Sequence, residues 1–343
     1  MTFTVHIMPS GHRFDMDSDE SVLDAALRQG YAFPYGCRNG GCGACKGKLL
    51  TGSVNYGTNR PPALSDDDIN QGLALFCQAR ATSDLRVEVK EIGDAENLEI
   101  KTLPTKVSKK EFLSHDVVRL YLKLPEAERM QFRAGQYIDI LLPDGRKRSF
   151  SLANAPHDDA LIELHIRHVD GGDFTGYVMD ELHEKDILRI EGPHGHFFLR
   201  EEAQRPLIFM AGGTGFAPIK GIIEHALAEG LNQPMYLYWG VREEKDLYLD
   251  ELPKKWAKYL PHFHFIPVFS EQAAGSGSPE NRRTGYVHDA VIEDFPDGIA
   301  AFDVYASGPP VMVHAGFDAF KKHGLTEDRY FSDAFEFQTP KSK

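Results

Sequence analysis

The sequence has few of the features that mark membrane, secreted or nucleic-acid-binding proteins. It has only four cysteines in 343 residues, and no apolar run approaches the length of a membrane span. Its first residues lack a basic segment followed by an apolar core, so no secretory signal is expected. Acidic residues outnumber basic ones by 51 to 38, and the net charge of -13 argues against binding nucleic acid or an anionic membrane. We therefore expect a soluble cytoplasmic protein, with an acidic surface that suits either solubility or docking onto a basic partner.

The length predicts more than one domain. A chain of 343 residues typically forms two or three domains, and 42% hydrophobic residues supply enough apolar surface for a core in each. The composition is that of a globular protein, neither fibrous nor disordered.

The cysteines form one pattern. Cys37, Cys42 and Cys45 have the spacing C-x4-C-x2-C, the plant-type ligand spacing for a 2Fe-2S cluster, and Cys77 supplies the fourth thiolate. The glycines between them let backbone N–H groups approach the cluster sulfurs. A zinc site with four cysteine ligands is the alternative, although zinc knuckles usually pair two short C-x2-C elements. No cysteine is left for a disulfide, which fits a reducing compartment.

The first quarter of the chain predicts a small domain around this loop. Residues 2–8 and 13–16 alternate as strands, and Ser18 or Asp19 is expected to cap a helix that ends at Gly30. Ser65 is expected to cap a second helix, and a strand returns the last cysteine. Together with the cysteine spacing, these elements resemble a plant-type ferredoxin of the β-grasp fold, over residues 1–92.

Arg38 and Asn39 are the bulky residues between the first two cysteines. They are candidates for contact with a partner protein, and the alternative is that they are ordinary solvated loop residues.

A linker is expected over residues 93–103, followed by short alternating strands that predict an antiparallel β-barrel over residues 104–201. This stretch contains RSFSLAN at 148–154, GGDFT at 171–175 and GPHGHF at 192–197. The three motifs together resemble the flavin-binding domain of the ferredoxin-NADP reductase family, which implies bound FAD.

The resemblance assigns roles within the first two motifs. The Arg148 guanidinium suits the FAD pyrophosphate, the Phe150 ring suits stacking on the isoalloxazine, and the Ser151 hydroxyl is expected near flavin N5. The family usually has Tyr where this chain has Phe150, so looser flavin binding is expected. Further candidate flavin-binding residues are Ser149, His165, Gly171, Gly172 and Thr175.

The last domain is expected over residues 202–343. Residues 207–210 form the continuous apolar run of a buried parallel strand, and a glycine-rich turn and a helix over 219–228 follow. Such a turn lets the backbone and the helix N-terminus bind a dinucleotide pyrophosphate. The sequence departs from G-x-G-x-x-G but resembles the Rossmann-like nicotinamide-binding domain of the same family. The candidate residues of the turn are Gly212, Gly213, Thr214 and Gly215.

Near the C-terminus the sequence reads SGPP where the family normally has CGPP. Ser307 therefore stands where a thiol would lie close to the reacting carbon of the nicotinamide, and we expect altered hydride transfer without loss of activity. Gly308 and Pro309 keep the turn on which the nicotinamide lies. Phe335 is expected to cover the flavin, with a plain packing role as the alternative.

NADH is favoured over NADPH. Glu243 and Glu244 follow the strand that should end near the adenosine ribose, and carboxylates favour a free 2′-hydroxyl. Arg242 has the opposite effect and is a candidate contact to the nucleotide.

The domain order is shared by FAD reductases of multicomponent oxygenases and by the reductase of CDP-6-deoxyhexose biosynthesis. The resemblance therefore implies an electron-transfer reductase: NADH delivers two electrons to FAD, and the 2Fe-2S cluster passes them singly to a protein acceptor, an oxygenase or dehydratase component. Two alternatives remain. One is a self-contained reductase of a quinone or free flavin, and the other is a zinc-bearing interaction module without flavin.

Overall fold

A computed structural model describes residues 2–41, 43–89, 91, 98–271 and 283–335. The chain divides into two compact units, Met1–Leu98 and Glu99–Lys343. None of the helices in these described ranges combines the length and apolar character that a membrane span requires.

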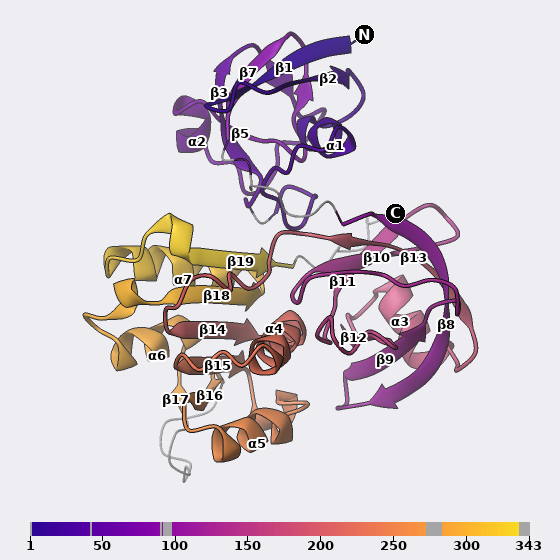
Figure 1. Ribbon diagram of the computed structural model, residues 1–343, viewed down its shortest axis with the longest axis vertical. Coiled ribbons are helices and arrows are strands. Elements are labelled where there is room, and N and C mark those ends of the chain that lie inside the picture. The colour runs from indigo at the N-terminus through magenta and orange to yellow at the C-terminus, as the bar shows by residue number, and fades with distance from the viewer. Residues whose placement is uncertain (1, 42, 90, 92–97, 272–282, 336–343) are drawn as a thin grey trace. The chain divides into compact units, whose positions relative to one another are not determined.

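The first unit is built on a mixed five-stranded sheet (Figure 1). Strand β1 pairs antiparallel with β2 and parallel with the central strand β7, as in a β-grasp domain. A separate pair, β4 and β6, lies outside this sheet. In sheet order the strands are β2 (Arg13–Asp17), β1 (Thr2–Met8), β7 (Leu85–Glu88), β3 (Lys46–Thr51) and β5 (Leu73–Leu75), and the separate pair is β4 (Val54–Asn55) and β6 (Arg80–Ala81).

The two helices in the described part of this unit are capped by serine. The helix α1 (Val22–Arg28) has Ser21 as its cap, and the Ser21 hydroxyl accepts a hydrogen bond from the Asp24 N–H. The expectation of a cap at Ser18 or Asp19 was therefore wrong: those residues lie in the turn after β2. Ser65 caps α2 (Asp66–Asn70) in a full capping box, as the sequence predicted.

The second unit begins with an antiparallel six-stranded sheet (Figure 1). A bridge between Leu152 and Leu164 connects its two edges, so the sheet closes into a barrel as expected. The helix α3 (Asp173–Asp180) packs beside it. Strand β8 begins inside the linker expected over 93–103. The strand order is β11 (Lys147–Ser151), β10 (Tyr137–Leu141), β13 (Ile187–His194), β8 (Lys101–Phe112), β9 (Val117–Lys123) and β12 (Ile162–Arg167).

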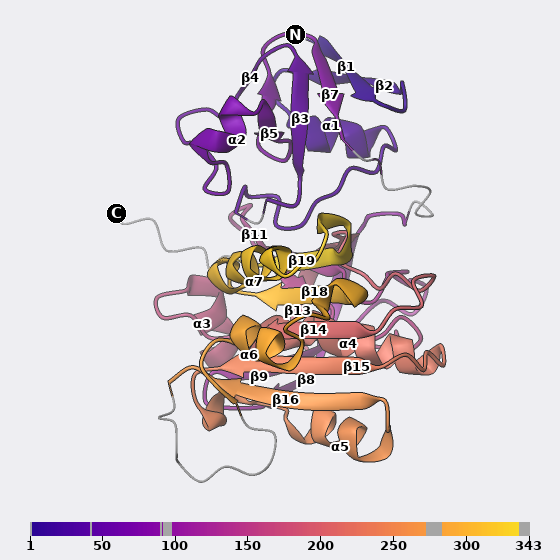
Figure 2. The same cartoon turned by 90° about the vertical axis from the view of Figure 1, so that its left-hand side faces the viewer.

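The remainder of the second unit contains a six-stranded sheet in which every pair is parallel. Figure 2 shows β18, β14, β15 and β16 side by side in that order. The central strand β14 is buried along its whole length, as its apolar sequence predicted. The strand order is β17 (Arg283–Thr284), β16 (Phe263–Phe269), β15 (Met235–Val241), β14 (Leu207–Gly212), β18 (Asp303–Gly308) and β19 (Tyr330–Ala334).

Helices cover both faces of this parallel sheet. Phe209 of β14 packs in one core with Phe216 of α4 and Trp256 of α5. On the opposite face, a Cβ on Gly316 of α7 would lie 2.6 Å from the Met210 methyl carbon, so the glycine allows α7 to approach β14 closely. The helices are α4 (Phe216–Ala228), α5 (Glu251–Tyr259), α6 (Val287–Asp294) and α7 (Pro310–Lys322), with short 3-10 turns η1 (Gly213–Gly215), η2 (Glu244–Asp246), η3 (Ile299–Ala301) and η4 (Glu327–Arg329).

Candidate cofactor sites

The cysteine loop of the first unit brings thiols together. Cys45 and Cys77 are buried, and the Cys77 N–H donates to Cys45 Sγ at 3.5 Å. Hydrogen bonding from Cys77 lowers the pKa of the Cys45 thiol, against burial, which raises it. A thiol that ionises readily is what a metal ligand requires. Cys37 lies in the same loop, and Cys42 falls outside the described residues.

Glycine permits the turns of this loop. Gly40 and Gly43 have φ of +84° and +78°, a left-handed conformation that residues with a Cβ rarely adopt. A Cβ on Gly40 would also lie 2.8 Å from Pro61 Cβ. The thiols and the compact glycine backbone fit a 2Fe-2S cluster held by Cys37, Cys42, Cys45 and Cys77.

Arg38 and Asn39 make contacts within the unit. The Arg38 guanidinium donates to Asp24 of α1 at 2.6 Å, and its backbone carbonyl accepts from Gln78 Nε2 at 2.8 Å. Asn39 accepts from the Gly41 N–H at 3.1 Å. These contacts stabilise the conformation of the loop. They favour the interpretation that Arg38 and Asn39 are ordinary loop residues over the interpretation that they contact a partner protein.

The strand β11 carries the flavin motif of the barrel. Its side chains alternate, so Arg148 and Phe150 lie on one face and Ser149 on the other. Phe150 packs against Phe174 of α3 with ring centroids 5.7 Å apart and stays partly exposed. An aromatic ring supported from one side, two residues from a guanidinium, fits a stacked isoalloxazine with its pyrophosphate nearby.

Four of the expected flavin residues are engaged elsewhere. The Ser149 hydroxyl donates to Asp139 at 2.6 Å, on the face away from Phe150. The Thr175 hydroxyl accepts from the Val169 N–H at 3.1 Å, so it stabilises the turn before α3. Gly171 and Gly172 belong to that same turn, where Gly172 is the α3 N-cap and Gly171 has a φ of +72°.

His165 also has contacts that the sequence did not predict. Its Nδ1 lies 3.0 Å from the Tyr248 hydroxyl, and its Nε2 lies 2.9 Å from Glu163 Oε1. Both ring nitrogens are thus taken up by protein groups, and the expected flavin contact of His165 gains no support.

Two further residues join His165 in a buried set. Lys220 of α4 donates to the Ala153 carbonyl at 3.0 Å, to Glu163 at 3.1 Å and to Glu224 at 2.9 Å. This set joins the barrel to the parallel-sheet domain. We call it the interdomain network, and its members are Glu163, His165, Lys220, Glu224 and Tyr248.

The electrostatics of this network follow from its burial. Burial opposes the ionisation of Glu163, but the hydrogen bond from His165 and the charge of Lys220 outweigh it and lower the pKa of Glu163 to about 2. Burial also lowers the pKa of His165, which keeps its ring neutral at pH 7. The carboxylate and the ammonium compensate each other's charge in this buried site, so removing either one alone would be costly.

The glycine turn after β14 is a closely packed backbone cradle. A Cβ on Gly215 would lie 2.0 Å from the Ser307 carbonyl oxygen, and a Cβ on Gly212 would lie 2.8 Å from Pro309 Cδ. Gly308 has a φ of +149° and meets Gly212 backbone to backbone. The motifs at 212–215 and 307–309 therefore meet at the carboxyl ends of β14 and β18, where dinucleotides bind in such sheets.

Ser307 is fully buried in this cradle. Within the described part of the chain its hydroxyl has no hydrogen-bond partner. The Asp333 carboxylate of the neighbouring strand accepts from Ser151 of the barrel at 3.3 Å, and the Phe335 N–H donates to the Gly308 carbonyl at 3.0 Å. The three residues expected at the reaction centre, Ser151, Ser307 and Phe335, are thus brought to one region.

Sequence reasoning missed Arg167, at the end of β12. A Cβ on Gly213 would lie 2.8 Å from Arg167 NH1, which places the guanidinium against the glycine turn. The Arg167 Nε lies 3.2 Å from Asp116, and its NH2 is buried with no hydrogen-bond partner in the described ranges. A buried N–H beside a glycine turn fits a dinucleotide phosphate. Arg167 lies two residues after His165 on the same strand, but only the fold brings its guanidinium to the glycine turn.

Arg242 follows β15 and is largely exposed. Its Nε lies 3.6 Å from Asp246, and Lys245 lies 3.1 Å from Glu243.

Comparisons with known proteins agree with this geometry. Residues 5–82 match the 2Fe-2S iron-sulfur cluster binding domain, residues 104–199 the oxidoreductase FAD-binding domain, and residues 209–316 the oxidoreductase NAD-binding domain. The CDP-6-deoxy-L-threo-D-glycero-4-hexulose-3-dehydrase reductase of Yersinia pestis is 39% identical over 98% of this chain and 99% of its own. The chain belongs to the NAD(P)H-dependent iron-sulfur flavoprotein reductases.

Other relatives of the reductase serve oxygenases. Terephthalate 1,2-dioxygenase reductase component 1 of Comamonas sp. is 35% identical over 98% of both chains. Among solved structures, the Amycolatopsis cytochrome P450 reductase GcoB has a TM-score of 0.79 and 35% identity over 97% of this chain and 98% of its own.

The family settles the chemistry of the cysteine loop in favour of iron and sulfur over zinc. When bound, FAD takes an electron pair from NAD(P)H and the 2Fe-2S cluster takes electrons one at a time, so the reductase moves electrons from NAD(P)H through FAD to the cluster.

Proposed function

We propose that the reductase uses NADH and delivers its electrons to the dehydrase component of a CDP-hexulose pathway. The observation that carries this proposal is the 39% identity to the Yersinia pestis dehydrase reductase over nearly the full length of both chains, against 35% to the terephthalate dioxygenase reductase component. An oxygenase component is the second candidate acceptor.

The surroundings of Arg242 support NADH. Its guanidinium lies beside the buried carboxylate of Asp246, and Glu243 and Glu244 follow it directly. A 2′-phosphate would meet these carboxylates, whereas a free 2′-hydroxyl could donate to one of them.

We assign the following roles to residues of the flavin motif and of the glycine turn. Arg148 binds the FAD pyrophosphate, Phe150 supports the isoalloxazine and Ser151 lies near its N5, oriented by Asp333. The cradle residues Gly212, Gly213, Thr214 and Gly215 bind the NADH pyrophosphate together with Arg167, while Ser307, Gly308 and Pro309 border the nicotinamide and Phe335 covers the flavin.

The acceptor is tested by electron delivery to purified partners. The reductase is mixed with NADH and either a CDP-hexulose dehydrase or a terminal oxygenase encoded beside it, and acceptor-dependent NADH oxidation is measured. Delivery to the dehydrase at least about tenfold faster than to the oxygenase supports the proposal, and the reverse preference contradicts it.

A Cys77→Ser variant is the control for this experiment. It should lose delivery to either protein acceptor because it cannot hold the cluster, yet it should still reduce ferricyanide from the flavin. Unchanged delivery to the acceptor would show that electrons bypass the cluster, as in a self-contained flavin or quinone reductase.

A further inference from the structure

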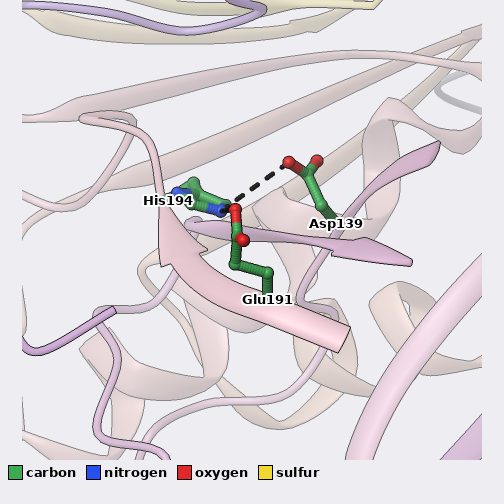
Figure 3. Close-up of side chains that lie close together, drawn as sticks. All are labelled: Asp139, Glu191 and His194. Carbon is green, nitrogen blue, oxygen red and sulfur yellow. Dashed lines mark ion pairs between the residues drawn. The ribbon is translucent and has the colours of Figure 1, made fainter. Parts of the chain in front are cut away.

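Three ionisable side chains meet on the barrel, and one of them, His194, belongs to the GPHGHF motif at 192–197. Asp139 lies on β10, and Glu191 and His194 lie on the neighbouring strand β13. Figure 3 shows the three side chains pointing toward one another. We call them the carboxylate–histidine cluster.

A β-bulge brings His194 into this cluster. Asp139 pairs with Glu191 and Tyr137 pairs with His194, so two steps along β10 match three along β13. Residues three apart on a regular strand face opposite sides, but the extra residue turns His194 to the side of Glu191. Bulges recur at sites where a side chain must be re-aimed.

The distances within the cluster match a metal site. His194 Nε2 lies 3.4 Å from Glu191 Oε1 and 3.7 Å from Asp139 Oδ2, and one ligand atom from each residue lies within 4.8 Å of the others. Ligand bonds to zinc of about 2.0–2.2 Å in a tetrahedron place the ligand atoms about 3.3–3.6 Å apart. Only a small movement of the two carboxylates is needed to close on one ion.

The hydrogen-bonding capacity of the cluster is unused at its centre. His194 is 1% exposed, and neither of its ring nitrogens has a hydrogen-bond partner among the residues that the structure describes. Asp139 is also buried, and its Oδ1 is oriented by the Ser149 hydroxyl at 2.6 Å, which leaves Oδ2 facing His194. The two carboxylates lie near His194 Nε2 but form no hydrogen bond with it, which is costly for a buried imidazole, whereas a metal ion would satisfy the ring and both carboxylates.

One cation already touches the cluster from outside. Lys147 Nζ lies 2.6 Å from Glu191 Oε1, the oxygen that also faces His194. Its side chain is 46% exposed, so it can move into solvent at little cost. Lys147 would therefore compete with an ion for Glu191.

We propose that Asp139, Glu191 and His194 bind one Zn²⁺ ion, with water as a fourth ligand. An imidazole combined with carboxylates suits zinc, whereas Ca²⁺ and Mg²⁺ prefer oxygen ligands alone. Because β10 pairs with both β13 and β11, the ion cross-links the strands beside the flavin motif.

The test is a zinc-binding measurement on the reductase with flavin and cluster in place. Wild type and variants are dialysed against Zn²⁺ buffered by a weak chelator, and zinc, iron and flavin per chain are measured on the same samples. Wild type should bind one more zinc than His194→Gln and Asp139→Asn, whose affinity should fall at least about tenfold. The exposed controls His157→Gln and Glu184→Gln should match wild type.

Equal zinc in wild type and both cluster variants would overturn the proposal and leave only an ion-pair cluster.

A Lys147→Met variant tests the site without altering a buried residue. Removing the competing ammonium should tighten zinc binding at least about threefold, and unchanged or weaker binding would count against the site even if the buried variants fail to fold.

Discussion

Two groups of buried polar side chains, one between the barrel and the parallel-sheet domain and one within the barrel, differ in how fully their hydrogen bonds are made. In the interdomain network, Lys220 uses its three donors on three acceptors, and both nitrogens of His165 are bonded. In the carboxylate–histidine cluster, the His194 ring has none, considering the described residues alone. A fully hydrogen-bonded buried group has a structural role, whereas a buried polar atom without a partner at a cofactor motif is a candidate ligand contact.

Arg167 and Ser307 resemble the carboxylate–histidine cluster in having buried polar atoms that form no hydrogen bond in the described part of the chain. Both are placed at the glycine cradle, and each keeps a buried polar atom without a hydrogen-bond partner in the described chain. Substitutions in the interdomain network should therefore change the free energy of unfolding. Substitutions at Arg167 and Ser307 should instead change nucleotide binding or the rate of flavin reduction.

The largest effect is expected from Lys220→Met. Removing one partner of a buried pair leaves the Glu163 charge uncompensated and should lower the free energy of unfolding by on the order of 3–5 kcal/mol. Urea unfolding followed by tryptophan fluorescence reports on it, since Trp239 and Trp256 both lie in the parallel-sheet domain. Adding Glu163→Gln should recover part of the loss, and a loss below about 1 kcal/mol would contradict a structural network.

The pH dependence of the free energy of unfolding should reflect the ionisation of Glu163 and His165 in the same network. The pKa of Glu163 is lowered from 4.5 to about 2 in the folded protein, so its contribution is complete above pH 4.5 and is lost as the pH falls toward 2. His165, kept neutral by burial, adds a loss that begins as the pH falls below 6.5. Unfolding free energies from pH 7 to 3 should therefore fall more steeply for wild type than for Glu163→Gln. Parallel curves would contradict the assignment.

Arg167→Met should weaken nucleotide binding and leave stability nearly unchanged. A hydrogen bond between a guanidinium and a phosphate contributes about 1.5–3 kcal/mol, so the KM for NADH should rise about 10- to 100-fold. Arg129→Met, at an exposed arginine paired with Asp159, serves as the matched control. A stability loss with an unaltered KM would place Arg167 among the structural groups.

Ser307→Ala should have the smallest effect on stability. Its hydroxyl makes no hydrogen bond within the described residues, so the free energy of unfolding should change by less than about 1 kcal/mol. Ser149→Ala, which breaks the bond to Asp139, should cost more. Stopped-flow flavin reduction by NADH should slow in Ser307→Ala by no more than about tenfold. A larger stability loss for Ser307→Ala than for Ser149→Ala would reverse the comparison.

Much of the fold was predictable because it depends on local pattern. The short alternating strands after residue 104 predicted a barrel, the apolar run at 207–210 predicted a buried parallel strand, and Ser65 predicted a helix cap. The cap of α1 was misplaced because several polar residues precede that helix and each could serve.

The candidate sites were predictable only where a motif is contiguous. The cysteine spacing, RSFS and the glycine turn each lie within one loop or strand, so their chemistry can be inferred from neighbouring residues. His165 and Ser149 were assigned to the flavin from their place in the chain, but the fold gives them partners from other elements.

The sequence by itself determined the three-domain order, the cysteine spacing and the two nucleotide motifs, because these depend on spacing within short segments. The tertiary structure alone decided which polar groups are satisfied. It brought Lys220 to Glu163, Arg167 to Gly213 and His194 to Asp139. Those contacts depend on strand register, on a bulge and on how α4 packs against the barrel, and none of these is encoded in the spacing of neighbouring residues.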